Sequence, residues 1–226
     1  MQFASALARG LAPTLPAAAE ADALLAIGNA MMSGRRADLA DGVFAFALRC
    51  APHDPRLHNG YGVVCANTLR HPQAADAFAR ARELAPNWLK PVVNEAEERT
   101  LLDELDRSEA LWRDAERLAP HDARSIAGRA MAMGQRGDLE PALELARAAV
   151  AADPRSPRAW QVLGQVCEWA WRHDEALDAF RRMEALVPGN PRAWAGIGAA
   201  LLSTGRWTEG FSALEHRRFG RHASST

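Results

Sequence analysis

Apolar residues recur along this chain of 226 residues at the spacing of short amphipathic helices. Trp160, Leu163 and Cys167 share one face of a predicted first helix, because residues three, four and seven apart lie on the same side of a helix. Phe180 and Met183 mark a second helix that follows it. Short polar or glycine-containing segments separate the two, so the pattern predicts helix pairs joined by tight turns.

Prolines recur at one constant interval along the chain, without a slip. They are Pro52, Pro86, Pro120, Pro154 and Pro188. This period predicts one helix pair copied along the chain, an array in which each copy contacts its neighbours. We predict an N-terminal capping segment, six repeats and a polar tail, with bounds at 1–20, then 21–54, 55–88, 89–122, 123–156, 157–190 and 191–218, and finally 219–226.

The junctions between repeats carry signals for the end of one helix and the start of the next. Each proline ends a second helix, and a capping residue two positions later opens the following first helix. The predicted N-caps are Asp54, Asp122, Ser156 and Asn190. Proline follows three of these caps, at the first helical position, where its missing N–H costs nothing.

The repeated unit resembles the tetratricopeptide repeat, which joins a 34-residue period to a large residue, a leucine-glycine pair, an alanine, an aromatic residue and a proline. In the fifth repeat these places hold Trp160, Leu163, Gly164, Ala176, Phe180 and Pro188. The resemblance covers about residues 21 to 218. It implies an all-α fold, a right-handed superhelical solenoid of helix-turn-helix repeats. It also implies a non-catalytic adaptor or scaffold that binds other proteins.

Positions of helix contact are mostly small or apolar, with two charged exceptions. Glycine or alanine recurs where paired helices must approach closely, as at Gly28 and Gly164. Glu95 in the third repeat and Arg129 in the fourth stand where other repeats have an apolar residue. Since they occupy the same register position in successive repeats, we expect them to be neighbours in a half-buried ion pair, and the alternative is two solvated charges.

Resemblance to the family implies that the first helix of each repeat lines the concave face. At the second place of successive repeats, five residues of six are basic, and farther along stand amides and one tryptophan. These candidate groove residues are Asn29, Arg56, Asn59, Lys90, Asn94, Arg124, Arg158, Gln161, Gln165, Trp169 and Arg192. Such a groove would hold an extended peptide, with amides on its backbone and cations on its carboxylates. Alternatively, acidic residues of the cap regions, Asp54, Asp122 and Asp153, neutralise the basic row within the chain.

Chaperone-binding members of the family hold two carboxylates with a lysine, two asparagines, a lysine and an arginine in three successive repeats. Asn29 and Lys90 match two of those places, whereas Leu25, Gly60 and Asn94 occupy the other three. A clamp for chaperone C-termini is therefore not expected.

Composition limits the classes of partner and the compartment. The formal net charge of −1 gives no general electrostatic attraction to nucleic acid, and no apolar run reaches the length of a membrane-spanning helix. Three cysteines, Cys50, Cys65 and Cys167, have no framework spacing, so we expect small core residues in a reducing compartment. The expected location is the bacterial-like cytoplasm.

Candidate chemistry is scarce. The seven histidines form no metal-ligand spacing, and no nucleophile stands beside a base, so we expect no metal site, no cofactor and no enzymatic activity. Paired carboxylates such as Glu97-Glu98 are expected on solvated helix faces.

The C-terminal end of the array keeps apolar residues where a polar cap is expected. They are Trp207, Phe211, Leu214 and Phe219. The segment from Gly205 to Arg218 resembles the last repeat of bacterial proteins in which such arrays precede a glycosyltransferase domain. Two alternatives to groove binding follow. The chain is an accessory or regulatory subunit of an enzyme system, docking through this end, or it is a self-assembling scaffold.

Overall fold

The computed structural model describes residues 17–34 and 36–219, and these residues form helices joined by short turns, with no strand among them. The chain divides into two compact bodies, residues 1–91 and 92–226, which we call the N-terminal body and the C-terminal body. The capping segment predicted at 1–20 and the tail predicted at 219–226 fall almost wholly outside the described residues. The all-α prediction is confirmed.

The described part of the N-terminal body consists of two helix pairs and the start of a further helix. Its helices are α2 (Ala17–Ser33), α3 (Ala37–Cys50), α4 (Pro55–Asn67) and α5 (His71–Leu84). α2 packs on α3 and α4 packs on α5, while α3 also contacts α4.

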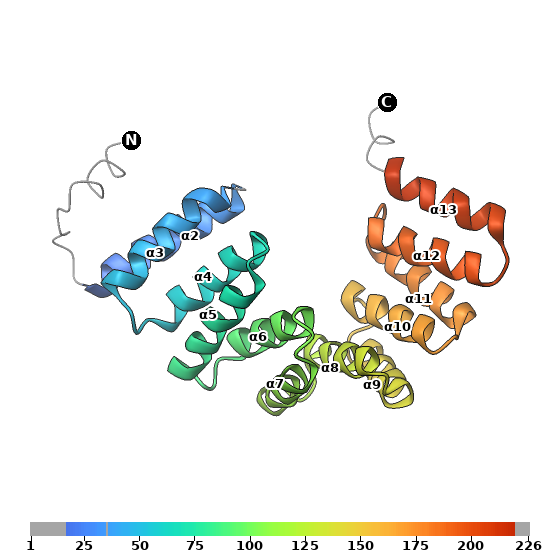
Figure 1. The fold of residues 1–226 in the computed structure, drawn as a ribbon, viewed down its shortest axis with the longest axis horizontal. Coiled ribbons are helices and arrows are strands. Elements are labelled where there is room, and N and C mark those ends of the chain that lie inside the picture. Colours follow the sequence, from blue (N-terminus) through green and yellow to red (C-terminus); the bar gives the residue numbers. More distant parts are fainter. Residues whose placement is uncertain (1–16, 35, 220–226) are drawn as a thin grey trace. The chain divides into compact units, whose positions relative to one another are not determined.

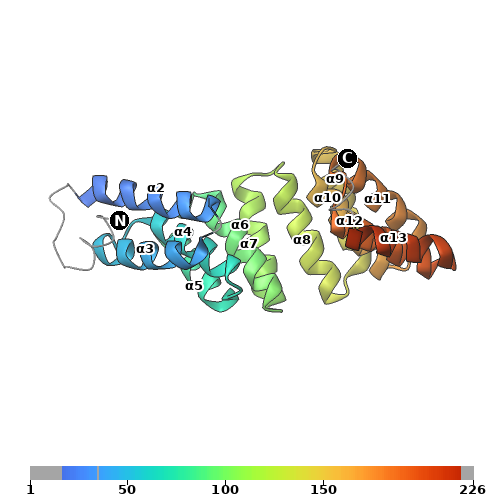
Figure 2. The same cartoon turned by 90° about the horizontal axis from the view of Figure 1, so that it is seen from above.

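The C-terminal body is built from the same kind of helix pair (Figure 1). Its helices are α6 (Leu89–Leu101, which begins in the N-terminal body), α7 (Leu105–Leu118), α8 (Ala123–Arg136), α9 (Leu139–Ala152), α10 (Pro157–Trp169), α11 (His173–Leu186), α12 (Pro191–Ser203) and α13 (Trp207–Phe219). The first helices α8, α10 and α12 contact one another in sequence, and α9, α11 and α13 each pack on the first helix that precedes them. Figure 2 shows the pair α12 and α13 at the end of this body.

Aromatic side chains act as wedges between neighbouring helices of the array. The buried ring of Phe180 on α11 lies against Gly164 of α10 and Gly196 of α12. A Cβ atom would come within 2.7 Å of that ring at Gly164 and within 2.5 Å at Gly196. Phe44 has the same relation to Gly28 and Gly60. A larger side chain at any of these four glycines would therefore collide with an aromatic ring; for Gly28 and Gly164 this agrees with the close approach that the sequence predicted.

The four predicted N-caps are confirmed. The side chains of Asp54 and Asn190 each accept a hydrogen bond of 2.9 Å from the backbone N–H two residues later. Asp122 accepts one of 2.8 Å and Ser156 one of 3.3 Å from the N–H three residues later. These bonds satisfy donors that a helix N-terminus leaves free, which fixes where α4, α8, α10 and α12 begin.

The turns inside the pairs from α4–α5 to α12–α13 each contain a residue with positive φ, always at the same register position. These residues are Leu69, Asp103, Gly137, Trp171 and Gly205, with φ between 58° and 97°. Glycine adopts this left-handed conformation without strain, whereas a side chain there costs about 1–2 kcal/mol. Leu69 and Trp171 are also 78% and 82% exposed, so packing does not compensate for that strain.

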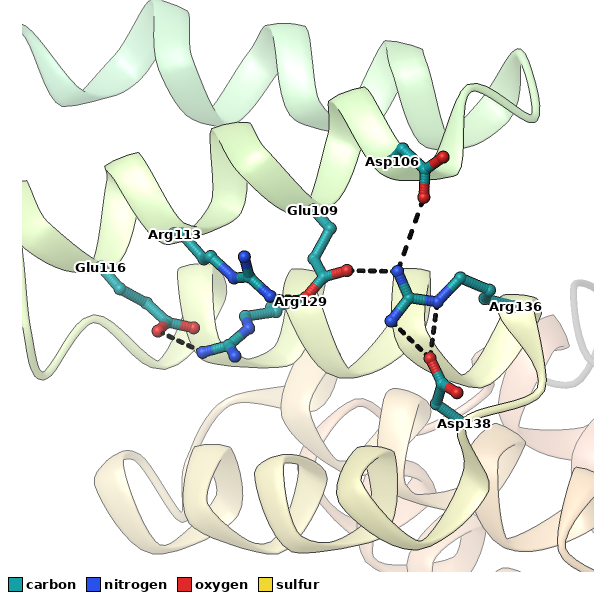
Figure 3. Close-up of polar contacts among 7 residues, drawn as sticks. All are labelled: Asp106, Glu109, Arg113, Glu116, Arg129, Arg136 and Asp138. Carbon is teal, nitrogen blue, oxygen red and sulfur yellow. Dashed lines mark hydrogen bonds and ion pairs between the residues drawn. The ribbon is translucent and has the colours of Figure 1, made fainter.

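Charged residues fill much of the interface between α7 and α8 (Figure 3). Glu109 on α7 is buried, and its carboxylate accepts hydrogen bonds of 2.6 Å from Arg113 and 2.5 Å from Arg136. Arg136 also pairs with Asp138 and lies 3.6 Å from Asp106. The Glu109 carboxylate thus binds two arginines, and Arg136 contacts carboxylates of α7 and of the turn that follows α8.

The cation that we expected to pair with Glu95 has a different partner. Arg129 Nη1 donates a 2.9 Å hydrogen bond to Glu116 of α7, whereas Arg99, one turn after Glu95 on α6, lies 3.6 Å from the Glu95 carboxylate. The expectation assumed that register neighbours meet. The long Arg129 side chain reaches the second helix of the preceding repeat, and Glu95 pairs with Arg99 of its own helix.

Two further expectations about the core need correction. Cys65 and Cys167 are buried, but Cys50 is exposed, so it is no core residue. Trp160 is only half-buried, and its Nε1 donates a 2.8 Å hydrogen bond to the carbonyl of Pro154, which holds the junction before α10 in place.

Among the described helices, not one combines the length and apolar character that a membrane crossing requires.

Candidate functional site: a cationic groove

A groove of about 700 Å³ lies on the C-terminal body, lined by α6, α8, α10 and α12. Residues at helical spacing form its sides. They include Arg124, Gly128, Met131 and Gln135 on α8, and Arg158, Gln161 and Gln165 on α10. The first helices thus line the groove.

Three arginines enter this groove from equivalent places. Arg124, Arg158 and Arg192 are the second residues of α8, α10 and α12, so the register of the repeat sets all three side chains on the same side. We call the groove that contains them the cationic groove. Positive charge at helix N-termini is unfavourable by a few tenths to about 1 kcal/mol each.

Arg124 is neutralised by a residue that sequence reasoning placed on a solvated face. Its guanidinium donates hydrogen bonds of 2.8 and 3.2 Å to the two carboxylate oxygens of Glu97 on α6, and a longer one of 3.4 Å to Asn94. The expectation for Glu97 is therefore corrected. No sequence signal pointed to this pair, because its members stand at different register positions of their repeats.

Arg158 differs from Arg124 in its surroundings. Burial lowers the pKa of the Arg158 guanidinium below its usual range; Glu97 counteracts this, and the positive charges of Arg192 and Arg124 lower the pKa further. Within the described ranges, no ion pair or side-chain hydrogen bond joins Arg158 or Arg192 to a carboxylate. The groove therefore holds two cations that lack an anionic partner in the described part of the chain.

A smaller channel of about 370 Å³ adjoins the groove, between α10 and α12. Gln161 and Gln165 line both, and the Gln161 amide donates a 3.4 Å hydrogen bond to the Gln165 oxygen. Arg192 stands at one end of the channel, and Trp169 with Glu168 at the C-terminal end of α10. One part of the Trp169 ring rests on Gly134 of α8, and the side chain is 37% exposed.

The remaining residues of the predicted basic row belong to the N-terminal body. Arg56 lies in the N-terminal body and pairs with Asp54 and Asp22, each at 2.6 Å, so neutralisation within the chain is correct for this residue. The predicted carboxylate Asp122 instead caps α8, and Glu97 takes its place beside Arg124. The remaining candidates of the N-terminal body are Asn29, Asn59 and Lys90, of which Asn59 is buried.

The apolar residues near the C-terminus separate into two kinds. Trp207 and Phe211 on α13 are 61% and 58% exposed. Leu214 faces inward, since a Cβ atom at Gly198 of α12 would come within 2.7 Å of its side chain. Leu214 therefore belongs to the packing of α12 on α13, and the side chain of Phe219 lies outside the described residues.

Two observations concern potential metal ligands and one cysteine in the part of the chain that the structure describes. There, no group of three histidine, cysteine or acidic side chains has metal-binding geometry. Burial raises the pKa of the Cys167 thiol to about 11, which keeps it protonated and weakly nucleophilic at neutral pH.

Comparison with known proteins identifies the repeat. The sequence profile described as tetratricopeptide repeat matches residues 25–87, 128–191 and 172–217, which together make up more than half of the chain. No curated protein matches the sequence.

Solved structures share the fold at low sequence identity. TTC0263, a thermophilic TPR protein of Thermus thermophilus, is 20% identical with a TM-score of 0.70, and the match covers 80% of this chain and 99% of that one. PilW, a type IV pilus biogenesis factor, is 15% identical with a TM-score of 0.76, covering 91% of this chain and 94% of that one. The APC/C hetero-tetramer Cut9-Hcn1 is 16% identical with a TM-score of 0.78, covering 91% of this chain but 41% of that one. Identities this low show the fold alone.

Proposed function

Because the chain belongs to the tetratricopeptide repeat family, we propose that it is a non-catalytic protein-interaction module whose cationic groove binds an extended, acidic segment of a partner protein. Arg158 and Arg192 receive the carboxylates of that segment. Gln161 and Gln165 bond to its backbone, since each amide offers both a donor and an acceptor to an unpaired peptide group.

The state of Arg158 carries this proposal. Its charge is partly withdrawn from water, it stands near two other cations, and no carboxylate of the described chain is bonded to it. A carboxylate entering the groove would relieve that electrostatic penalty and form charge-assisted hydrogen bonds, which are about twice as strong as neutral ones. Each such contact contributes about 0.2–1 kcal/mol where it remains solvent-exposed, and salt weakens it.

Peptide display on the immobilised full chain tests the proposal without a known partner. We expect the selected random peptides to be enriched in aspartate and glutamate, and the enrichment to disappear for the double variant Arg158→Ala, Arg192→Ala. Arg182→Ala is the matched control, because Arg182 is exposed on α11 and does not line the groove. Selection of peptides without acidic residues, or an unchanged result with the double variant, would show that the groove is not the binding site.

A second candidate function rests on the exposed rings of Trp207 and Phe211 on α13. This face would dock a separate protein, such as an enzyme of glycosyl transfer, or a second copy of the chain. Phe211→Asp should then abolish complex formation while leaving the peptide selection unchanged. A mass that rises with protein concentration, measured by sedimentation, would identify self-assembly.

We also propose a cytoplasmic location. All three cysteines are free, as is typical of proteins in a reducing compartment.

A further inference from the structure

The channel between α10 and α12 has opposite charge at its two ends. Gln161, Gln165 and Trp169 follow one another along α10, and Arg192, Gly196 and Ala199 along α12, so the channel runs parallel to both helices. Arg192 supplies a cation near the N-terminal ends of the helices, with Arg158 at the same register position on α10. Glu168 supplies a carboxylate at the other end.

The end that contains Glu168 suits a cation for two independent reasons. Among the described residues, the Glu168 carboxylate has one long hydrogen bond, 3.4 Å, to His173, which leaves acceptor capacity for a second donor. Trp169, beside it, presents an indole ring that rests on Gly134 and is 37% exposed. Tryptophan is the side chain that attracts cations most strongly through its ring face. Alanines of α12 keep this end open for an aliphatic stem.

The distance between the ends sets the spacing of the two ligand charges. Trp169 follows Arg158 by eleven residues on α10, which corresponds to about 16 Å along a helix rising 1.5 Å per residue. An extended peptide rises about 3.3 Å per residue, so about five residues of ligand cover that length.

From this geometry we infer that the channel binds an extended segment with an acidic side chain at the Arg158 and Arg192 end and a lysine or arginine, about five residues away, at the Trp169 and Glu168 end. The inference rests on the proposed function and deepens it, because it assigns the partner a second, basic contact and a spacing. Gln161 and Gln165 lie between the two ends, where they meet the peptide backbone.

Synthetic peptides of one composition and different order provide the test. The probes are fluorescently labelled glycine-serine peptides with one glutamate and one lysine separated by two, five or nine positions, in both chain directions. We expect the five-residue spacing to bind the full chain at least threefold more tightly than the others, as measured by fluorescence anisotropy at low salt. Tighter binding of a peptide with leucine or phenylalanine in place of lysine would overturn the inference.

Variants assign each end of the peptide to its residues. Glu168→Gln and Trp169→Ala should weaken the lysine peptide several-fold and leave its lysine-to-glutamine counterpart unchanged. Arg192→Ala should weaken binding of the peptide that contains glutamate several-fold and leave binding of its glutamate-to-glutamine counterpart unchanged. Glu144→Gln is the matched control, since Glu144 is exposed on α9 away from the channel. Thermal melting confirms that each variant is folded.

The outcomes separate the two proposals. Binding that depends on the glutamate and on Arg192, but neither on the lysine nor on Glu168, would overturn the bipolar ligand and leave the acidic ligand of the proposed function intact. Absence of binding by every peptide, together with failure of the display experiment, would overturn both.

Discussion

At the α7–α8 interface a second helix meets the following first helix among charged side chains, whereas at α11–α12 the same two kinds of helix meet around the ring of Phe180. Both interfaces keep an aromatic wedge, because Trp112 lies against Gly128 as Phe180 lies against Gly196. They differ beside the wedge, where Glu109 gathers Arg113 and Arg136 in the first case (Figure 3). These two interfaces therefore share an aromatic wedge and the glycine against it, while the residues around them are charged in one and apolar in the other. Apolar contacts resist salt and acid, and charged contacts make the interface sensitive to both.

The largest effect is expected from removing a wedge. Phe180→Ala should lower the free energy of unfolding by about 3–5 kcal/mol, because it leaves a cavity against both Gly164 and Gly196. Urea denaturation measures this, and the loss should be the same at low and high salt. Arg182→Ala, an exposed change on the same helix, should have almost no effect. A small loss for Phe180→Ala would contradict the wedge.

A smaller effect is expected at the charged interface. Glu109→Gln keeps the shape of the side chain but removes the charge that two arginines share, so it should cost about 1–3 kcal/mol. The partly exposed arginines regain water, which limits the loss. Unlike the loss for Phe180→Ala, this one should shrink at high salt in the same urea experiment. A salt-independent loss would mean that packing, and not charge, holds α7 to α8.

The turn that opens α11 should tolerate a stabilising change. Trp171→Gly relieves a φ of 58° at an exposed position and should stabilise the fold by about 0.5–1 kcal/mol, raising the melting temperature. The matched change is Gly205→Ala, where φ is 78° in the corresponding turn and a comparable destabilisation is expected. Equal melting temperatures for Trp171→Gly and the wild type would show that the positive φ of Trp171 does not destabilise the fold.

The smallest effect is expected at the ion pair between Arg56 and the half-buried Asp54. The hydrogen bond from the Arg56 side chain holds the pKa of Asp54 below its ordinary value of 3.8, with help from the Arg56 backbone N–H. The charge of Asp54 therefore stabilises the fold above about pH 4, and this stabilisation is lost as the pH falls through the lower pKa of the folded state. Asp54→Asn keeps the cap, as Asn190 does at α12, and should cost about 0.5 kcal/mol at pH 7.

Unfolding at two pH values checks the sign for Asp54→Asn. The difference from the wild type should disappear as the pH falls through the lowered pKa of Asp54 in the folded state and its carboxyl becomes protonated. A difference that persists in acid would assign the effect to the cap and not to the charge.

The sequence predicted the features that depend on the register of the repeat. It did not predict the ion pairs, which depend on how far long side chains reach. The period, the helix pairs, the four caps and the position of Arg158 and Arg192 follow from a regular repeat of short-range signals. The partners of Arg124 and Arg129 do not, because an arginine at a given register position can reach carboxylates on either neighbouring helix. The register of the repeat fixes where the Cα atom of an arginine lies. Its ion-pair partner depends on how the long, flexible side chain beyond that atom extends. The same limit placed Glu97 on a solvated face and left Arg56 among the binding residues.

The ion pair of Glu97 with Arg124 sets how many arginines of the cationic groove lack an anionic partner within the described chain. With Glu97 in place, two guanidiniums are available to a ligand; with a neutral residue at that position there would be three. A single-residue change on α6 therefore adds an anion-binding place without disturbing α8, α10 or α12. Under the proposed function, a change at this one half-buried residue would set how acidic a partner the groove prefers, with the framework of the repeats left as it is.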